Sequence, residues 1–191
     1  MRQLLCLCLA LCLALSLTLT AAAEGEAPAW KGIRGLDWGA SKEDIVALEG
    51  ENYAETASMD EALGLTGLLY TEGISVSRFD NAYLAYIIGE RGLFLAGYSI
   101  DFEDAAGDYD YLVDALTSLY GPAAPEKEAE FVGLMRGFSS GTPARITCWQ
   151  ADRTGILLTA DDYTIEILYI GLDYFPELPG PEGSQPDTTG L

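Results

Sequence analysis

The chain has 191 residues, with 30 acidic against 10 basic side chains and no histidine, which gives a formal net charge of −20. A surface this negative repels phosphate backbones and anionic lipid headgroups, so binding to nucleic acid or to membrane surfaces is disfavoured. The absence of histidine excludes Ser-His-Asp and Cys-His catalysis and zinc sites built on imidazole. An unknown protein, a cationic peptide or a divalent cation stays compatible as a partner, and so does a charge that serves solubility alone.

The N-terminal segment is typical of a cleavable export signal. Arg2 supplies a positive end, an apolar run follows from Leu4 to Leu19, and Ala21-Ala22-Ala23 has the small-x-small pattern that signal peptidase accepts. An uncleaved anchor is the alternative, since a helix of roughly 20 residues can cross a bilayer. No basic stop-transfer cluster follows the segment. We therefore predict a signal peptide over 1–23, an extracytoplasmic location and no stable membrane insertion after cleavage.

Three of the four cysteines, Cys6, Cys8 and Cys12, lie inside this signal. None of them follows a small residue in the way that lipid attachment requires, so we interpret them as small hydrophobic side chains. Exported disulfide scaffolds carry even sets of cysteines, whereas the mature chain keeps Cys148 alone. We expect a domain stabilised by hydrophobic burial, with Cys148 as a buried thiol and intermolecular pairing as the alternative.

Cleavage leaves 168 of the 191 residues and a net charge of −21, because one basic residue is removed. That length suits a single domain, since about 150 residues bury about 68–70% of their unfolded surface. Residues 24–29 are predicted to form a flexible leader. Residues 176–191 contain four prolines and three glycines and are predicted to be a disordered tail. The folded domain is expected over 30–175.

Two helices are marked by their caps and their periodicity. Ser41 and Asp44 form a variant of the capping box, and Gly50 marks the end of this first helix. We expect Asp108 to be the N-cap of a second helix, whose apolar residues recur at three- and four-residue spacing until Gly121-Pro122.

Alternating patterns and turn residues indicate six strands. They are expected over Ile74–Phe79, Tyr83–Ile88, Leu93–Phe102, Arg145–Gln150, Ile156–Thr159 and Thr164–Ile170. Leu68–Tyr70 is a possible further short strand, and Glu126–Ser139 fits neither pattern. The sequence thus predicts an α+β fold in which two short helices pack on one face of an antiparallel sheet, in the order α-βββ-α-βββ. An ancient duplication would produce this order.

The third predicted strand has two distinct faces. Phe94, Ala96, Tyr98, Ile100 and Phe102 are expected to face the core, whereas the intervening Gly97, Ser99 and Asp101 are expected to point away from it.

The run Gly35-Leu36-Asp37-Trp38-Gly39-Ala40-Ser41-Lys42-Glu43-Asp44-Ile45 resembles the W-G-x-S-x-(E/D)-(E/D)-(I/V) opening of many small exported bacterial proteins. Further likenesses are Phe79-Asp80-Asn81-Ala82-Tyr83-Leu84, Tyr98, and Leu116 with Leu119-Tyr120-Gly121-Pro122. Together they resemble the beta-lactamase-inhibitor-protein-like superfamily, which includes the small outer-membrane assembly lipoproteins. The resemblance implies short helices on an antiparallel sheet and a function in protein binding without catalysis. The chain departs from it in lacking a lipid-attachment cysteine and the disulfides of the inhibitor branch, and no functional residue carries over.

Carboxylates are the remaining candidates for chemistry. The acidic stretch of Asp101, Glu103, Asp104, Asp108 and Asp110 fails the EF-hand pattern, because alanines occupy the fifth and sixth positions counted from Asp101. A looser calcium site is the alternative to an exposed loop with a helix cap, and Asp161-Asp162 is interpreted as a hairpin turn. A glycosidase-like hydrolase would need two carboxylates about 5–9.5 Å apart, but no pair stands out among 30 acids.

Aromatic side chains are the other candidate surface. Trp149 shares a predicted strand face with Thr147 and Arg145, opposite Ile146 and Cys148. If that face is open, Trp149 is a contact residue; the alternative is that it belongs to the core. We predict a non-enzymatic exported module that binds a protein or peptide, with no catalytic, cofactor or metal site. A small carboxylate-dependent hydrolase and a calcium-dependent envelope protein are the alternatives.

Overall fold

The structure is a computed structural model that describes residues 32–57, 64–101, 105–135, 138 and 143–176. The predicted signal peptide, leader and nearly all of the predicted tail lie outside the described residues. Within the described part, no helix is long and apolar enough to span a membrane.

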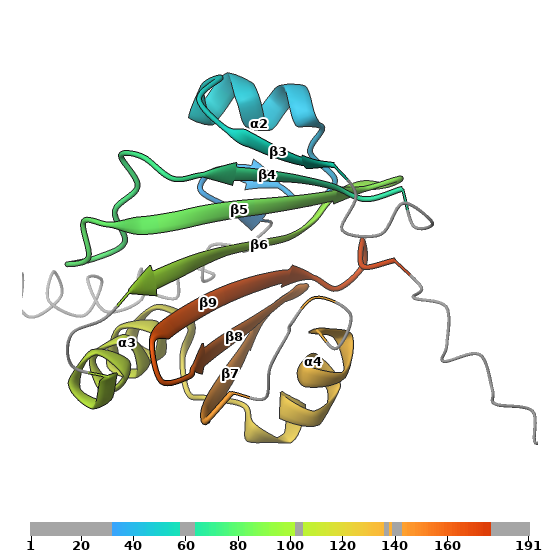
Figure 1. Ribbon diagram of the computed structural model, residues 1–191. Coiled ribbons are helices and arrows are strands. Elements are labelled where there is room, and N and C mark those ends of the chain that lie inside the picture. The colour runs from blue at the N-terminus through green and yellow to red at the C-terminus, as the bar shows by residue number, and fades with distance from the viewer. Residues whose placement is uncertain (1–31, 58–63, 102–104, 136–137, 139–142, 177–191) are drawn as a thin grey trace, which may run out of the picture.

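A seven-stranded antiparallel sheet runs through the whole domain (Figure 1). Its strand order is β3-β4-β5-β6-β9-β8-β7, so two meanders lie side by side and meet through their last strands, β6 and β9. The strands are β3 (Ala54–Ala57), β4 (Thr66–Tyr70), β5 (Ala82–Gly89), β6 (Gly92–Asp101), β7 (Arg145–Ala151), β8 (Thr154–Ala160) and β9 (Thr164–Gly171). The order is nearly symmetric about the β6–β9 pair, as a duplication would make it.

The described part contains three α-helices and a small hairpin besides the sheet. The helices are α2 (Lys42–Glu49), α3 (Ala105–Tyr120) and α4 (Glu128–Met135), the last preceded by a 3₁₀ turn at Pro125–Lys127. The hairpin pairs β1 (Gly32–Ile33) with β2 (Leu36–Asp37). The α+β class with an antiparallel sheet is therefore confirmed.

The expected caps are present at α2. The Ser41 hydroxyl accepts the Asp44 N–H at 3.2 Å, and the Asp44 carboxylate accepts the Ser41 N–H at 2.9 Å. Gly50 then leaves the helix with a φ of 95°. In α3, by contrast, Asp108 lies in the first turn instead of at the N-cap, because the helix already begins at Ala105.

The predicted order of elements differs from the structure in several places, beginning with the β1–β2 hairpin that precedes the first helix. Residues 128–135, in the segment that fitted neither pattern, form α4. The predicted strand Ile74–Phe79 is a tight turn, in which Val76 and Phe79 exchange two backbone hydrogen bonds of 2.9 Å. Its apolar alternation reflects burial of Ile74 beside a reversal of the chain at Ser77, where φ is 53°. With β3 and β4 present, four strands separate the first two helices.

Helices lie on both faces of the sheet, whereas the sequence predicted one covered face. The larger core lies between the sheet and the layer formed by α2, α3 and the β1–β2 hairpin. The smaller core lies on the opposite face, where Phe131 and Met135 of α4 pack against Phe94, Leu157 and Ile170. Because α4 is short, it covers one end of that second face only.

A bulge explains why one expected core residue lies on the other face. Ile87 pairs with Leu95 and Ile88 pairs with Leu93, so Phe94 has no partner on β5. The extra residue shifts the alternation at this point. Phe94 therefore joins the smaller core, whereas Ala96, Tyr98 and Ile100 face the larger one as predicted.

Trp38, which follows the β1–β2 hairpin, packs against β8 and β9 of the C-terminal meander. Its ring lies so close to Gly171 that a Cβ on this glycine would be 2.6 Å from the indole. Its Nε1 donates to the Thr154 hydroxyl at 2.8 Å, and the following Gly39 N–H donates to the Leu93 carbonyl at 2.8 Å. The Trp-Gly pair in the sequence thus marks a packing contact.

We expect the Gly171→Ala variant to lose about 1–3 kcal/mol of unfolding free energy, because its new methyl group overlaps the Trp38 ring. Urea denaturation measures this loss. Gly133→Ala in α4 is the matched control, since nothing lies within 4 Å of the added methyl group. Helix propensity predicts that it gains up to about 1 kcal/mol. Equal stabilities of the two variants would contradict the assigned Trp38 contact.

Candidate functional site

The second face of the sheet carries side chains in rows that run across the strands. One row contains Tyr83, Ser99, Glu166 and Thr159, each opposite the next. The neighbouring row contains Leu69, Ala85, Gly97, Leu168 and Leu157. Figure 1 shows β5, β6 and β9 crossing the middle of the molecule with none of the described helices in front of them.

Small residues at the centre of these rows produce a shallow groove. Its volume is about 100 Å³, and its lining includes Leu69, Tyr83, Ala85, Gly97, Ser99, Glu166 and Leu168. A Cβ on Gly97 would come within 2.6 Å of Leu168 Cδ2 and 2.9 Å of the Ile167 carbonyl oxygen, so a side chain here would force its neighbours to shift. Leu168 therefore leans over β6, and the groove lies beside it. We call this feature the sheet groove.

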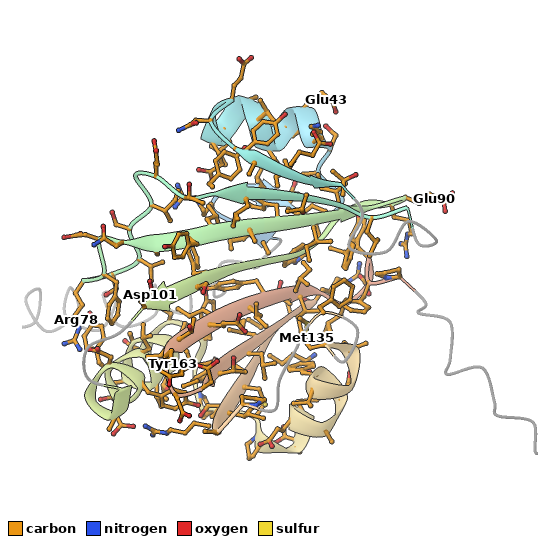
Figure 2. The ribbon with its side chains drawn as sticks, in the orientation of Figure 1. Glu43, Arg78, Glu90, Asp101, Met135 and Tyr163 are labelled. Carbon is orange, nitrogen blue, oxygen red and sulfur yellow. The ribbon has the colours of Figure 1, made fainter. Side chains whose placement is uncertain are left out.

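The two ends of the second face differ. Figure 2 labels Asp101 at the end of β6 and Tyr163 in the β8–β9 turn, at one end of the sheet, and Met135 of α4 toward the other. Tyr163 is 80% exposed. Beyond the sheet groove on the Met135 side, three aromatic rings pack together with centroid distances of 5.3–5.9 Å, and Phe175 lies edge to face against both Phe94 and Phe138.

Glu166 is the charged residue among those that line the sheet groove. It is half buried, and burial raises the pKa of its carboxyl group. The negative charge of Asp161 raises that pKa further, whereas a hydrogen bond with the Thr159 side chain lowers it. Among the described residues Glu166 has no ion-pair partner. A carboxylate so placed costs stability and could compensate a positive charge from outside.

The neighbouring Asp161 is committed to the β8–β9 turn. Its Oδ1 accepts the N–H groups of Tyr163 at 2.8 Å and of Thr164 at 2.7 Å, and these bonds lower the pKa of its carboxyl group. The predicted hairpin turn at Asp161-Asp162 is thus present. The two carboxyl groups, Glu166 and Asp161, have pKa values shifted in opposite directions, but only Glu166 lines the sheet groove.

Trp149 lies on the larger-core side of β7 and is 0% exposed. Its Nε1 donates to the Thr117 hydroxyl of α3 at 3.3 Å. The face that it shares with Thr147 is thus the covered one, as the core alternative proposed, and Trp149 offers no surface to a partner. Sequence reasoning missed the sheet groove, although the expectation that Gly97, Ser99 and Asp101 point away from the core named its central strand.

Two described members of the acidic stretch form ion pairs between α3 and other parts of the chain. Asp108 forms an ion pair with Arg78, and Asp110 forms one with Arg145, whose guanidinium lies 3.9 Å from the centre of the Tyr109 ring. Glu103 and Asp104 lie outside the described residues. Over the described part, no group of three or more acidic or cysteine side chains converges as metal ligands would.

A second acid, whose partners all come from the chain, contrasts with Glu166. The side chain of Glu49 is only 5% exposed and accepts two hydrogen bonds from Arg34, at 2.6 and 3.1 Å, and one from the Tyr86 hydroxyl at 2.6 Å. Burial and this bond raise the pKa of Tyr86. Because every partner comes from the chain itself, this cluster joins α2 to the sheet and leaves no site for a ligand.

Comparison of the chain with family models, with curated protein sequences and with solved structures finds no significant match. The resemblance to the beta-lactamase-inhibitor-protein-like superfamily therefore stays a prediction.

We expect Glu166→Gln to be more thermally stable than the wild type at pH 7. The folded-state pKa of Glu166 is raised, so folding binds its proton more tightly, and stability is lost as the pH rises through the carboxyl range. The advantage of the variant should vanish at pH 3, where both side chains are neutral. Melting curves at both pH values measure it. Glu90→Gln, in the exposed β5–β6 turn, is the control, and its melting temperature should differ little from that of the wild type at either pH. A Glu166→Gln variant less stable than the wild type at pH 7 would contradict the proposed cost of burying the charged carboxylate.

Burial raises the pKa of the Cys148 thiol to about 11 from an ordinary value of 9.0. Only the thiolate reacts with disulfide reagents. We therefore expect native protein at pH 8 to react at least about 100-fold more slowly than urea-unfolded protein, as followed by absorbance of the released thiol. Equal rates would show an accessible Cys148 and favour the intermolecular-pairing alternative.

Proposed function

We propose that this chain is an exported, non-enzymatic module that binds a protein or peptide segment in the sheet groove. The observation that carries the proposal is an apolar depression on a sheet face that the described helices leave open, with one half-buried carboxylate in its lining. The N-terminal segment supports export, and the acidic surface supports a partner that is not itself acidic.

The size of the groove favours a protein partner over a small molecule. Ligand pockets have volumes of roughly 300–1,000 Å³ and enclose most of their ligand. The sheet groove, at about 100 Å³, has room for about one side chain. A surface that takes single side chains from a longer segment suits recognition of a peptide or of a protein loop.

A carboxylate-dependent hydrolase is the second candidate, because the pKa values of Glu166 and Asp161 are shifted apart in the manner of an acid and base pair. Against it, both hydrogen bonds to Asp161 Oδ1 come from the turn itself. A colour assay on nitrophenyl glycosides tests this candidate directly: turnover that Glu166→Gln abolishes would support the hydrolase and overturn the binding proposal.

Selection of random peptides displayed on phage against the exported protein tests the binding proposal. We expect a set of peptides whose affinity falls at least tenfold in Ser99→Trp, because the indole would fill the groove. Ser118→Trp, on the exposed side of α3, is the matched control and should bind all of them unchanged. The proposal fails if Ser99→Trp, shown by circular dichroism to be folded, selects and binds the same peptides as the wild type.

A further inference from the structure

The sheet groove combines apolar walls with one acidic group. Leu69, Ala85 and Leu168 present hydrocarbon, and Tyr83, which is 39% exposed, presents an aromatic ring at the rim. Glu166 lies beside them, opposite Ser99 on β6 and Thr159 on β8. The side chains that match such a surface are lysine and arginine, whose long hydrocarbon stems pack on apolar groups while the charged end reaches a carboxylate.

The charges around the groove have the same sign as Glu166. Asp161 and Asp162 lie in the β8–β9 turn, and Asp101 lies at the adjoining end of β6, opposite Thr164. No lysine or arginine lines the groove in the described part of the chain. The local field therefore favours a cation, and the ring of Tyr83 adds a face on which a cation can lie.

The chain itself is a poor source of that cation. The C-terminal segment 177–191 contains three acidic residues and no basic one. Six of the seven described basic residues already form ion pairs with acids of the same chain. The seventh, Arg91, lies over the ring of Tyr174 at 5.1 Å from its centre. Neither this segment nor the described surface of a second copy offers a basic side chain without a partner, which favours another protein as the source of the occupant; Lys31 and Arg136 lie outside the described residues.

We propose that Glu166 forms a subsite for one lysine or arginine side chain of an apolar peptide segment of a partner protein, with the stem of that side chain between Leu168 and Tyr83. This inference rests on the proposed function, because it names the chemistry of what the sheet groove binds. The raised pKa of Glu166 agrees with a carboxylate that lacks its counter-ion in the free protein. Formation of the ion pair would offset that cost upon binding.

Phage selection on three proteins, the wild type, Glu166→Gln and the remote control Glu90→Gln, tests the subsite. We expect peptides selected on the wild type and on Glu90→Gln to carry one lysine or arginine between apolar residues. We expect those selected on Glu166→Gln to lose that position while keeping the apolar ones. Because Glu90→Gln removes the same charge elsewhere, attraction to the net negative surface alone would affect both variants alike.

A double-mutant cycle then measures the contact by calorimetry, with a selected peptide and the same peptide carrying norleucine in place of its lysine. We expect the norleucine change to weaken binding at least tenfold in the wild type and less than twofold in Glu166→Gln. Equal losses in the two proteins would overturn the subsite and leave groove binding intact. Peptides that bind Ser99→Trp as well as the wild type would overturn the groove itself, and the subsite with it.

Discussion

The pairing of β6 with β9 is the constraint on which the rest of the domain depends. It joins two meanders that are far apart in the sequence into one sheet, from Leu95 opposite Ile170 to Asp101 opposite Thr164. On one face of this strand pair, Tyr98 and Ile167 enter the larger core. On the opposite face, Gly97 lies opposite Leu168 and Ser99 lies opposite Glu166. The register that completes the core thus also assembles the sheet groove, because side chains on neighbouring residues of a strand point to opposite faces.

Coverage of the two faces follows from the lengths of the helices. The 16-residue α3, with α2 and the hairpin, spreads over the larger core, whereas the eight-residue α4 shields one end of the second face. On the part of the second face that α4 does not cover, the centre of the sheet carries the small residues Ala85, Gly97 and Ser99. Small residues limit the apolar area that water must contact, and they also leave the depression. The part of this face that the described helices do not cover therefore carries the sheet groove in which we propose that a partner binds.

The acidic residues that are not fully exposed differ in whether the chain itself supplies a partner for their charge. Glu49 is buried with a bidentate Arg34 and the Tyr86 hydroxyl, and Asp108 and Asp110 of α3 form ion pairs with Arg78 and Arg145. The pair with Arg34 compensates the desolvation of the buried Glu49 charge within the chain. Glu166 is the exception: it is half buried, beside apolar residues, and without a described cation. A half-buried charge without an ion-pair partner in the chain breaks a rule that proteins otherwise follow, and such exceptions are typical of functional sites. The proposed binding role therefore includes Glu166.

The sequence by itself determined the local features. The capping box at Ser41, the apolar period of α3, the hairpin turn at Asp161-Asp162 and the outward direction of Gly97 follow from patterns of a few neighbouring residues. Only the tertiary structure decided which strands adjoin, that α4 covers the second face, that the bulge moves Phe94 across the sheet, and that Trp149 lies under α3. Periodicity reports which side of a strand is apolar, whereas the identity of the covering element depends on contacts between distant segments. Glu166 illustrates the limit, because one acid among 30 becomes distinctive only when the β6–β9 register places it beside Gly97 and Leu168.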